Sequence, residues 1–209
     1  MKTYPSIYGP AKAPRAECIA FVKYDGSCLR FEFSKKRGWY KFGTRRLLFD
    51  LTHEFWGRAI PIFENTLAEG IEKAIQDNKD YRGVEHVTVF CEFFGPNSFA
   101  GQHVEEDKFE LILFDVNPLK KGFVSPRNFV NHFGHLRYAA EVVYEGMLDQ
   151  PFIEAIKAGV YPLQEGVVCK GGEGHKLWMN KIKTAAWIER VKAAYPETWS
   201  KFHDPKDEI

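Results

Sequence analysis

The sequence predicts an α+β fold in which largely antiparallel sheets are flanked by helices. Strand-like and helix-like runs are interspersed along the 209 residues, without the strict alternation that is typical of parallel sheets. Two pairs of neighbouring strand-like runs are joined by short turns, and they therefore predict β-hairpins. Hydrophobic residues make up 44% of the chain, which is enough to form one sizeable core.

The first hairpin lies close to the amino terminus. Residues 18–22 form a short apolar run, and residues 28–33 alternate between apolar and polar side chains as a half-buried strand does. The basic run 35–38 ends in glycine and predicts a turn. Residues 39–44 then predict the returning strand of the hairpin.

The middle of the chain predicts one helix and two strands. Apolar residues recur at helical spacing over residues 64–78, which indicates an amphipathic helix. Residues 87–94 are rich in β-branched and aromatic side chains and end at Gly95 and Pro96, so we expect a strand closed by a breaker. Residues 109–116 predict a further apolar strand.

The last third of the chain predicts three helices and a second hairpin. One helix begins at residues 125–126, where serine is followed by proline, and another covers 149–158 before Gly159. Residues 166–182 predict a hairpin around a glycine-rich turn. Residues 184–194 predict the final helix, with an apolar face.

Charge and cysteine content narrow the class of protein. A net charge of +1 argues against a protein that holds nucleic acid by bulk charge alone, although basic residues could line a local groove. The four cysteines form no CxxC pair, and no histidine lies near one at zinc-finger spacing, which argues against a structural zinc. Free cysteines favour a reducing compartment, so we expect a cytoplasmic protein.

Five short motifs gather the residue types that nucleotide chemistry requires. The first is Lys23-Tyr24-Asp25-Gly26, which taken alone fits a solvated turn equally well. The others follow in this order: Cys91-Glu92-Phe93-Phe94-Gly95-Pro96, Phe114-Asp115-Val116, Glu165-Gly166-Val167-Val168-Cys169-Lys170 and Trp178-Met179-Asn180-Lys181-Ile182-Lys183. Five motifs in a fixed order are far more specific than any one of them.

This ordered set resembles the covalent nucleotidyltransferase superfamily of ATP-dependent polynucleotide ligases and mRNA capping enzymes, and it is most similar to phage-type RNA ligases. The resemblance implies an ATP-grasp-like nucleotidyltransferase (adenylation) domain over residues 1–183. A short helical tail over residues 184–209 is expected to pack on that domain. The compact chain is typical of a small viral or phage-encoded enzyme, and we expect a monomer.

The resemblance makes Lys23 the nucleophile that takes AMP from ATP and forms lysyl-AMP. Lysine attacks phosphorus only when neutral, and its ordinary pKa is about 10.4. We expect partial desolvation and the positive charge of Lys181, Lys183, Arg45 and a bound metal to lower the pKa of Lys23. Lys181 and Lys183 lie two residues apart in a strand and thus share a face, where the resemblance assigns them to the α-phosphate. The alternative for this pair is a solvated edge strand.

The resemblance also assigns two carboxylates and an aromatic ring to the nucleotide. Glu165 is expected to bind Mg²⁺ or Mn²⁺, since hard cations prefer oxygen ligands. Glu92 is expected to contact the ribose or the metal, although it could equally be the outward face of an alternating strand. Phe114 is expected to stack on adenine, with Phe109 as a competing candidate and core packing as the alternative for either.

Further contacts to ATP are implied near the first hairpin. Arg45 matches the arginine that reaches phosphate, Arg46 is the adjacent alternative, and Arg30 is a weaker candidate. Backbone groups of Phe21 and Val22 are expected to read the adenine edge. Backbone recognition leaves no sequence signature, so ATP rather than GTP follows from the ligase resemblance alone.

Two departures from the pattern of DNA ligases and capping enzymes favour RNA over DNA as the substrate. Cys28 occupies the position, five residues after Lys23, where DNA ligases and capping enzymes usually carry arginine. Too few residues follow Lys183 for the five-stranded OB-fold barrel of those enzymes, so we expect no OB-fold domain.

The predicted activity is joining of 5′-phosphate and 3′-hydroxyl ends, with basic residues 35–46 forming part of the polynucleotide surface. A minimal DNA ligase that seals nicks is the first alternative. A non-catalytic nucleic-acid-binding module that retains the fold is the second.

Overall fold

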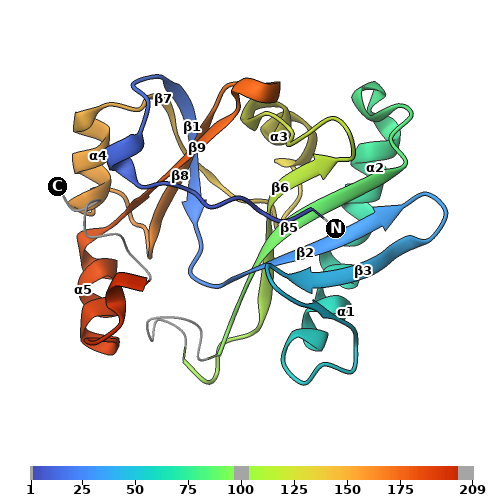
Figure 1. The fold of residues 1–209 in the computed structure, drawn as a ribbon, viewed down its shortest axis with the longest axis horizontal. Helices are drawn as coiled ribbons and strands as arrows, with labels where there is room; N and C mark the ends of the chain where they lie inside the picture. The colour runs from blue at the N-terminus through green and yellow to red at the C-terminus, as the bar shows by residue number, and fades with distance from the viewer. Residues whose placement is uncertain (1, 97–103, 202–209) are drawn as a thin grey trace.

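A computed structural model describes residues 2–96 and 104–201, and it contains two antiparallel β-sheets with helices packed against them (Figure 1). The five-stranded sheet has the order β4-β3-β2-β5-β6. Its strands are β2 (Ser27–Ser34), β3 (Gly38–Thr44), β4 (Leu48–Phe49), β5 (His86–Phe94) and β6 (Glu110–Pro118). The four-stranded sheet has the order β7-β1-β8-β9. Its strands are β1 (Glu17–Lys23), β7 (Val142–Met147), β8 (Gly166–Gly171) and β9 (Trp178–Lys183).

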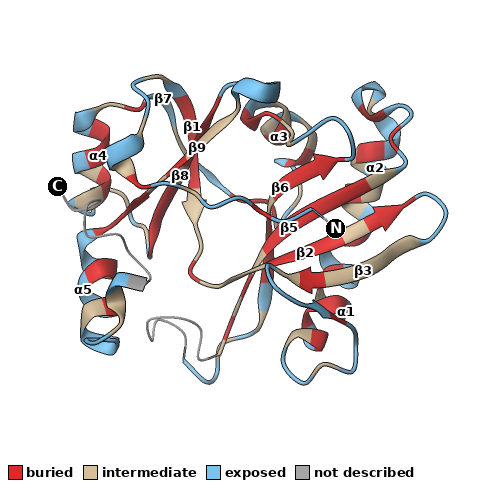
Figure 2. Cartoon of the chain, viewed as in Figure 1, coloured by how far each residue is buried: buried red, intermediate tan, exposed pale blue. Residues whose placement is uncertain are grey.

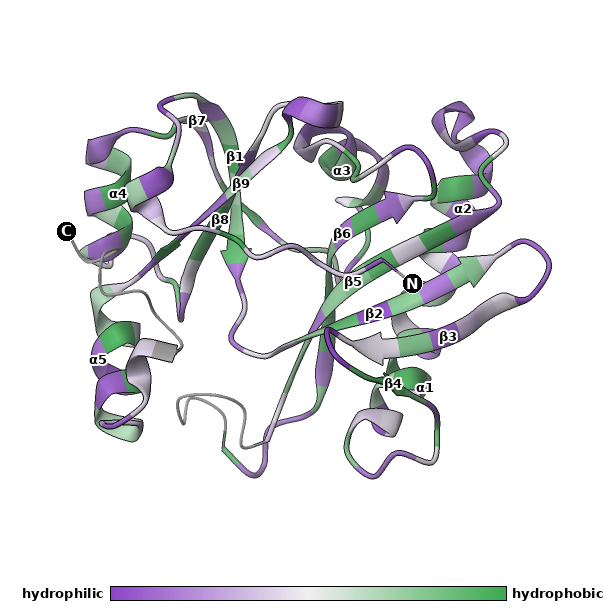
Figure 3. Ribbon diagram, viewed as in Figure 1, coloured by the Kyte–Doolittle hydropathy of each residue, from purple (hydrophilic) through white to green (hydrophobic). Residues whose placement is uncertain are grey.

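The five-stranded sheet confirms the first predicted hairpin. Apolar residues Leu29, Phe31 and Phe33 of β2 are buried, as expected for alternate positions of a strand that faces a core on one side. Gly38 has φ +67° at the turn, a backbone conformation that glycine adopts without strain. Figure 3 shows hydrophilic residues at this hairpin tip and hydrophobic residues along β2 and β5.

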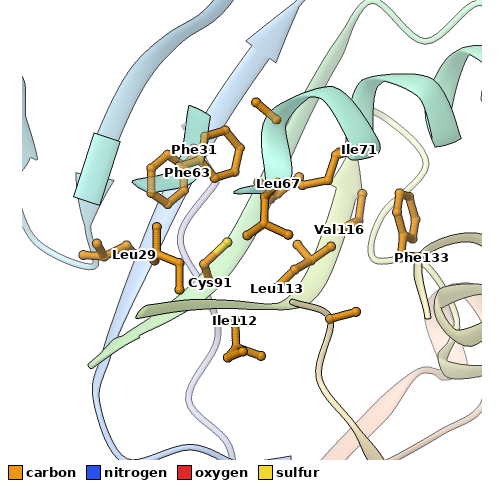
Figure 4. Packing of buried hydrophobic residues seen from close by; sticks show 14 of the residues in the cluster. Leu29, Phe31, Phe63, Leu67, Ile71, Cys91, Ile112, Leu113, Val116 and Phe133 are labelled. Atoms are coloured by element: carbon orange, nitrogen blue, oxygen red, sulfur yellow. The ribbon is translucent and has the colours of Figure 1, made fainter. Parts of the chain in front are cut away.

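A long helical run covers the five-stranded sheet and begins earlier than residues 64–78 predict. It consists of α1 (Ala59–Phe63), a π-helical turn (Glu64–Ala68) and α2 (Glu69–Asp77). Its apolar stripe packs on β2, β5 and β6, and Phe63 stacks on Phe31 with ring centroids 4.1 Å apart (Figure 4). This packing forms the larger hydrophobic core, whose buried residues are coloured in Figure 2.

The four-stranded sheet confirms the second hairpin and adds a strand. Strand β1 lies between β7 and β8, which explains why its apolar run is continuous. Strand β7 was not expected from the sequence, because its side chains are exposed or half-buried and do not alternate clearly. Helix α4 (Gln150–Lys157) packs on this sheet through Phe152 and Ile156 and forms the second core.

Three helices begin at side-chain caps that the sequence signals. Ser125, Asp149 and Thr184 accept backbone N–H groups at the starts of α3 (Pro126–Phe133), α4 and α5 (Ala185–Ala194). Helix α4 stops before Gly159, which has φ +74° as a helix stop requires. Of the predicted tail, residues 202–209 lie outside the described part of the chain.

The amino-terminal segment joins the two sheets, and no sequence pattern predicts this. Arg30 Nη1 of β2 donates to the Lys2 carbonyl and to Thr3 Oγ1 at 3.1 and 2.9 Å. At the other sheet, Asn180 Nδ2 of β9 donates to the Gly9 carbonyl at 2.6 Å. Figure 1 shows the segment as a dark blue trace that crosses between the sheets. No helix in the described residues has the length and apolar character needed to cross a membrane.

Candidate active site

A hollow of about 610 Å³ lies between the two sheets and is bordered by the amino-terminal segment. It gathers residues from β1, β2, β5, β6, β8 and β9, which are far apart in sequence. Its charged and aromatic lining includes Lys23, Glu92, Phe114, Lys170, Lys181 and Lys183. The structure therefore brings residues of all five sequence motifs to one cavity.

Lys23 stands at the end of β1, where the strand leaves the sheet. Its Nζ donates a hydrogen bond to Glu165 Oε2 at 2.8 Å, across 142 residues of sequence. Lys183 Nζ lies 3.1 Å from the other oxygen, Oε1, of the same carboxylate. Gly26 follows closely, and a Cβ there would collide with the carbonyl oxygen of Phe93. Glu165 thus bridges the predicted nucleophile and one lysine of the predicted pair.

The protonation of Lys23 differs from the sequence-based expectation. Burial acts to lower the pKa of Lys23, but the nearby carboxylates of Glu165, Glu92 and Asp25 outweigh it and raise the pKa above its ordinary value. The expected lowering by cationic neighbours is therefore wrong for this arrangement, because Glu165 is in direct contact. Burial lowers the pKa of Lys183 to about 8, so this lysine releases a proton more readily.

Two further carboxylates, those of Glu92 and Asp25, interact electrostatically with Lys23. Burial raises the pKa of Glu92 to about 7, and Glu165 adds to the shift while Lys23 opposes it. Burial also raises the pKa of Asp25 to about 6. Both groups therefore change charge near neutral pH, where ordinary carboxyl groups are fully ionised.

Cys28 lies opposite Glu92 in the register of β2 and β5 and also lines the cavity. Burial raises the pKa of the Cys28 thiol to about 12, so it stays neutral at neutral pH. An arginine at this position would place a cation beside Glu92. The thiol is neutral, and it is the positive charge of Lys23 that opposes the rise in the pKa of Glu92.

The structure decides between some of the alternative arginines and phenylalanines that the sequence left open. Arg45 and Arg46 are both exposed and both line the cavity, so geometry leaves either available for phosphate. Arg30 is buried and bonded to the amino-terminal segment. Phe114 lines the cavity, whereas Phe109 stacks on Phe93 and lines a separate hollow.

The backbone before Lys23 is engaged in the sheet. Phe21 and Val22 line the cavity, but the N–H of Val22 donates to the Glu141 carbonyl at 2.9 Å. This N–H is satisfied within the protein, so it offers no free donor to a base edge. The Phe21 ring is buried and packs edge-on against Phe129.

A buried ion pair between Lys170 and Asp115 forms part of the cavity wall, which Lys170 lines. Lys170 Nζ donates to Asp115 Oδ2 at 2.8 Å and to the Phe114 carbonyl at 2.7 Å. Tyr4 OH donates to the same Asp115 oxygen at 2.6 Å. Asp115 and Lys170 belong to two of the sequence motifs, but the motifs predict no role for either. Nothing in the sequence signals that Tyr4 joins them.

The predicted metal residues fit only part of a coordination shell. No group of three or more His, Cys, Asp or Glu side chains in the described residues is placed to hold a metal. Mg²⁺ commonly binds through one or two carboxylates together with substrate phosphates and water. Glu92 lines the cavity, and Glu165, which contacts Lys23 and Lys183, could supply a second carboxylate, so substrate phosphates and water would supply the remaining ligands.

A sequence profile of the RNA ligase family matches residues 16–185, which is most of the chain. The chain belongs to the RNA ligase family. All five motifs of this RNA ligase family member fall within the matched residues. A search of curated protein sequences returned no match.

Solved structures share the fold of this family member. An RNA ligase variant from Naegleria gruberi with AMP and Mn has a TM-score of 0.60 at 14% identity, over 83% of this chain and 51% of that one. A variant of the Naegleria gruberi RNA ligase with ATP and Mn has a TM-score of 0.60 at 15% identity, over 87% and 53%. A candidate ATP-dependent DNA ligase from Aquifex aeolicus has a TM-score of 0.65 at 17% identity, over 97% and 57%.

The chain thus spans 51% to 57% of the length of these three structures. Identities of 14% to 17% establish the fold and no more. The predicted α+β nucleotidyltransferase-type fold, with antiparallel sheets flanked by helices, is confirmed by them.

Proposed function

We propose that this protein is an ATP-dependent RNA ligase that forms a covalent lysyl-AMP intermediate on Lys23. One observation carries the proposal: Lys23 lines a cavity of about 610 Å³ that Glu92, Lys181 and Lys183 also line. A solvated turn, the alternative for Lys23, would not place it against buried Glu165 at 2.8 Å.

In the first step, Lys23 Nζ bonds to the α-phosphorus of ATP. The bond from that phosphorus to the bridging oxygen breaks, and pyrophosphate leaves with the electron pair. Lys23 must first lose a proton, and Glu165 Oε2 is the acceptor in contact with it. Lys181 and Lys183 line the cavity and can neutralise charge on the α-phosphate.

The rest of the pocket suits the other parts of ATP. Phe114 presents an aromatic ring for adenine, and Arg45 or Arg46 reaches phosphate from the cavity rim. Glu92 and Glu165 would hold Mg²⁺ or Mn²⁺ together with phosphate oxygens. When bound, the cation supplies positive charge beside the α-phosphate.

The later steps complete end joining. AMP passes from Lys23 to a 5′-phosphate, and a 3′-hydroxyl then displaces AMP and closes the phosphodiester. Membership of the RNA ligase family supports RNA as the substrate. We propose residues 1–183 as the adenylation domain, with the following helix packed on it, and a monomeric state.

The decisive experiment is incubation with ATP labelled on the α-phosphate and Mg²⁺, followed by denaturation and detection of covalent label. We expect the wild-type protein to be labelled and Lys23→Ala to carry none, because the attacking amine is gone. Lys176→Ala is the matched control, since Lys176 is exposed. It should be labelled normally.

Two outcomes would contradict the proposal. Label that persists in Lys23→Ala would place the nucleophile elsewhere. A wild-type protein without label would favour the non-catalytic nucleic-acid-binding module.

A panel of nicked duplexes and single strands, with ribose or deoxyribose at each end, separates RNA from DNA ligase activity. The similarity to the candidate DNA ligase of Aquifex aeolicus makes DNA nicks the second arm of this test. Sealing only of all-DNA nicks would contradict the RNA proposal while leaving the lysyl-AMP step intact.

A further inference from the structure

The first turn of α5 carries a tryptophan that reaches back into the candidate active site. Trp187 is 1% exposed, and its indole Nε1 donates to Asp25 Oδ2 at 3.0 Å. Asp25 belongs to the same four-residue motif as Lys23. Residues 16–185 match the RNA ligase family, so Trp187 lies just beyond them.

The face of the same indole holds a cation. Lys183 Nζ lies 3.6 Å from the centroid of the Trp187 ring and 3.1 Å from Glu165 Oε1. Cation–π contacts are effective within about 6 Å of the ring centroid, and tryptophan gives the strongest of them. One side chain therefore touches both the Asp25 carboxylate and the Lys183 ammonium.

A chain of hydrogen bonds fixes where the indole lies. The N–H of Thr184 donates to the Glu165 carbonyl at 2.9 Å. Thr184 Oγ1, the cap of α5, accepts the N–H of Trp187 at 3.2 Å. The indole then donates to Asp25. The helix start, the strand that carries Glu165 and the loop after Lys23 are thus connected in one path.

We propose, on the basis of the proposed lysyl-AMP function, that Trp187 is a positioning residue for adenylation of Lys23. Its N–H orients the Asp25 carboxylate, and its ring holds Lys183 against Glu165 on the side facing the phosphate. On this proposal helix α5 contributes to the reaction centre, although it follows residue 183, the predicted end of the adenylation domain.

A purely structural role is the competing explanation, because Trp187 also packs with Ile188, Val191 and Trp199. The pH dependence of adenylation distinguishes the two. Asp25 is surrounded by Glu165 of the β8 start, Lys23 of β1, Lys183 of β9 and Glu92 of β5. Burial raises the pKa of Asp25, and the indole N–H opposes that shift.

The test is the rate of covalent labelling by ATP across a pH series, for wild type and Trp187→Phe. Phenylalanine keeps a ring beneath Lys183 but cannot donate to Asp25. We expect a rate about 10-fold lower, with the acidic limb of the profile displaced to higher pH by about 0.5 to 1 unit, because Asp25 loses a donor. Trp199→Phe is the matched control from the same apolar cluster, and its profile should stay at the wild-type position.

Each result bears on the proposal. A Trp187→Phe protein with the wild-type rate and profile overturns the role of Trp187 while leaving lysyl-AMP formation intact. A wild-type protein without label overturns the proposed function and this role together.

If Trp187→Phe does not fold, the indole N–H resonance of wild-type Trp187 gives an independent readout. It should shift in Asp25→Asn, because a neutral amide oxygen is a weaker acceptor than the carboxylate that the indole contacts. A resonance that is unchanged in Asp25→Asn would show that the indole does not bond to Asp25 and would overturn the proposal.

Discussion

Two buried ion clusters face the same cavity and differ in how completely their charges are matched. The reactive cluster consists of Lys23, Asp25, Glu92, Glu165 and Lys183. The anchoring cluster consists of Tyr4, Asp115 and Lys170. Both connect strands of different sheets, so the difference between them is one of charge and access.

In the anchoring cluster each charge has a partner. The side chains of Lys170 and Asp115 are 4% and 2% exposed and pair at 2.8 Å. Tyr4 OH and the Phe114 carbonyl satisfy further hydrogen-bonding capacity. A buried pair with this many partners has little to gain by moving a proton.

In the reactive cluster the carboxylate of Glu165 is shared between two lysines. The side chain of Lys23 is 22% exposed and opens to the cavity. The pKa values of Glu92, Asp25 and Lys183, at about 7, 6 and 8, lie close to neutrality. On the proposed function, the reactive cluster would exchange protons and bind phosphate, while the anchoring cluster holds the adjacent wall of the cavity in place.

The largest expected effect is on activity, in Glu165→Gln. Removal of the acceptor in contact with Lys23 should lower the rate of lysyl-AMP formation by about 10³-fold, since general-base removal commonly costs 10²–10⁴. Stability should change little, because Lys23 can be solvated and Lys183 can release its proton. Labelling kinetics and denaturant unfolding measure the two effects. A Glu165→Gln protein that loses stability but keeps its labelling rate would show that Glu165 is a structural residue and not the proton acceptor.

The second effect is on stability, in Lys170→Met. This change leaves Asp115 as an unpaired buried charge, which should lower the free energy of unfolding by about 3–5 kcal/mol. Denaturant unfolding measures it, with Lys176→Met as an exposed control that should lie within about 0.5 kcal/mol of wild type. An unchanged free energy of unfolding would show that the pair does not anchor the wall.

The third effect is the pH dependence of stability in Glu92→Gln. Glu92 has a pKa of about 7 in the folded protein and 4.5 ordinarily, so the folded state holds its proton longer and wild-type stability falls as pH rises between these values. Glutamine removes this loss. At about pH 8 the variant should be more stable by on the order of 2–3 kcal/mol, and at about pH 4 the two should have equal free energies of unfolding.

Denaturant unfolding in the presence of a chelator measures this effect without divalent cations. If the free energies of unfolding of wild type and Glu92→Gln differ by the same amount at both pH values, burial does not raise the pKa of Glu92. Asp25 titrates nearby, but it is present in both proteins and largely cancels from the comparison.

The sequence by itself determined the two hairpins, the capped helices and the order of the five motifs. It also predicted that Lys181 and Lys183 share a face, because strand periodicity is a local property. Both line the cavity, as expected. Lys23 and Glu165 were predicted to be site residues because each lies in a short sequence motif.

Only the tertiary structure decided how these residues act on one another. It raises the pKa of Lys23, which the sequence led us to expect lowered, because Glu165 arrives from 142 residues away. It places Tyr4 on Asp115 and Trp187 on Asp25, neither of which lies near its partner in the chain. Charge interactions and burial depend on distance in space, and a sequence pattern reports only distance along the chain.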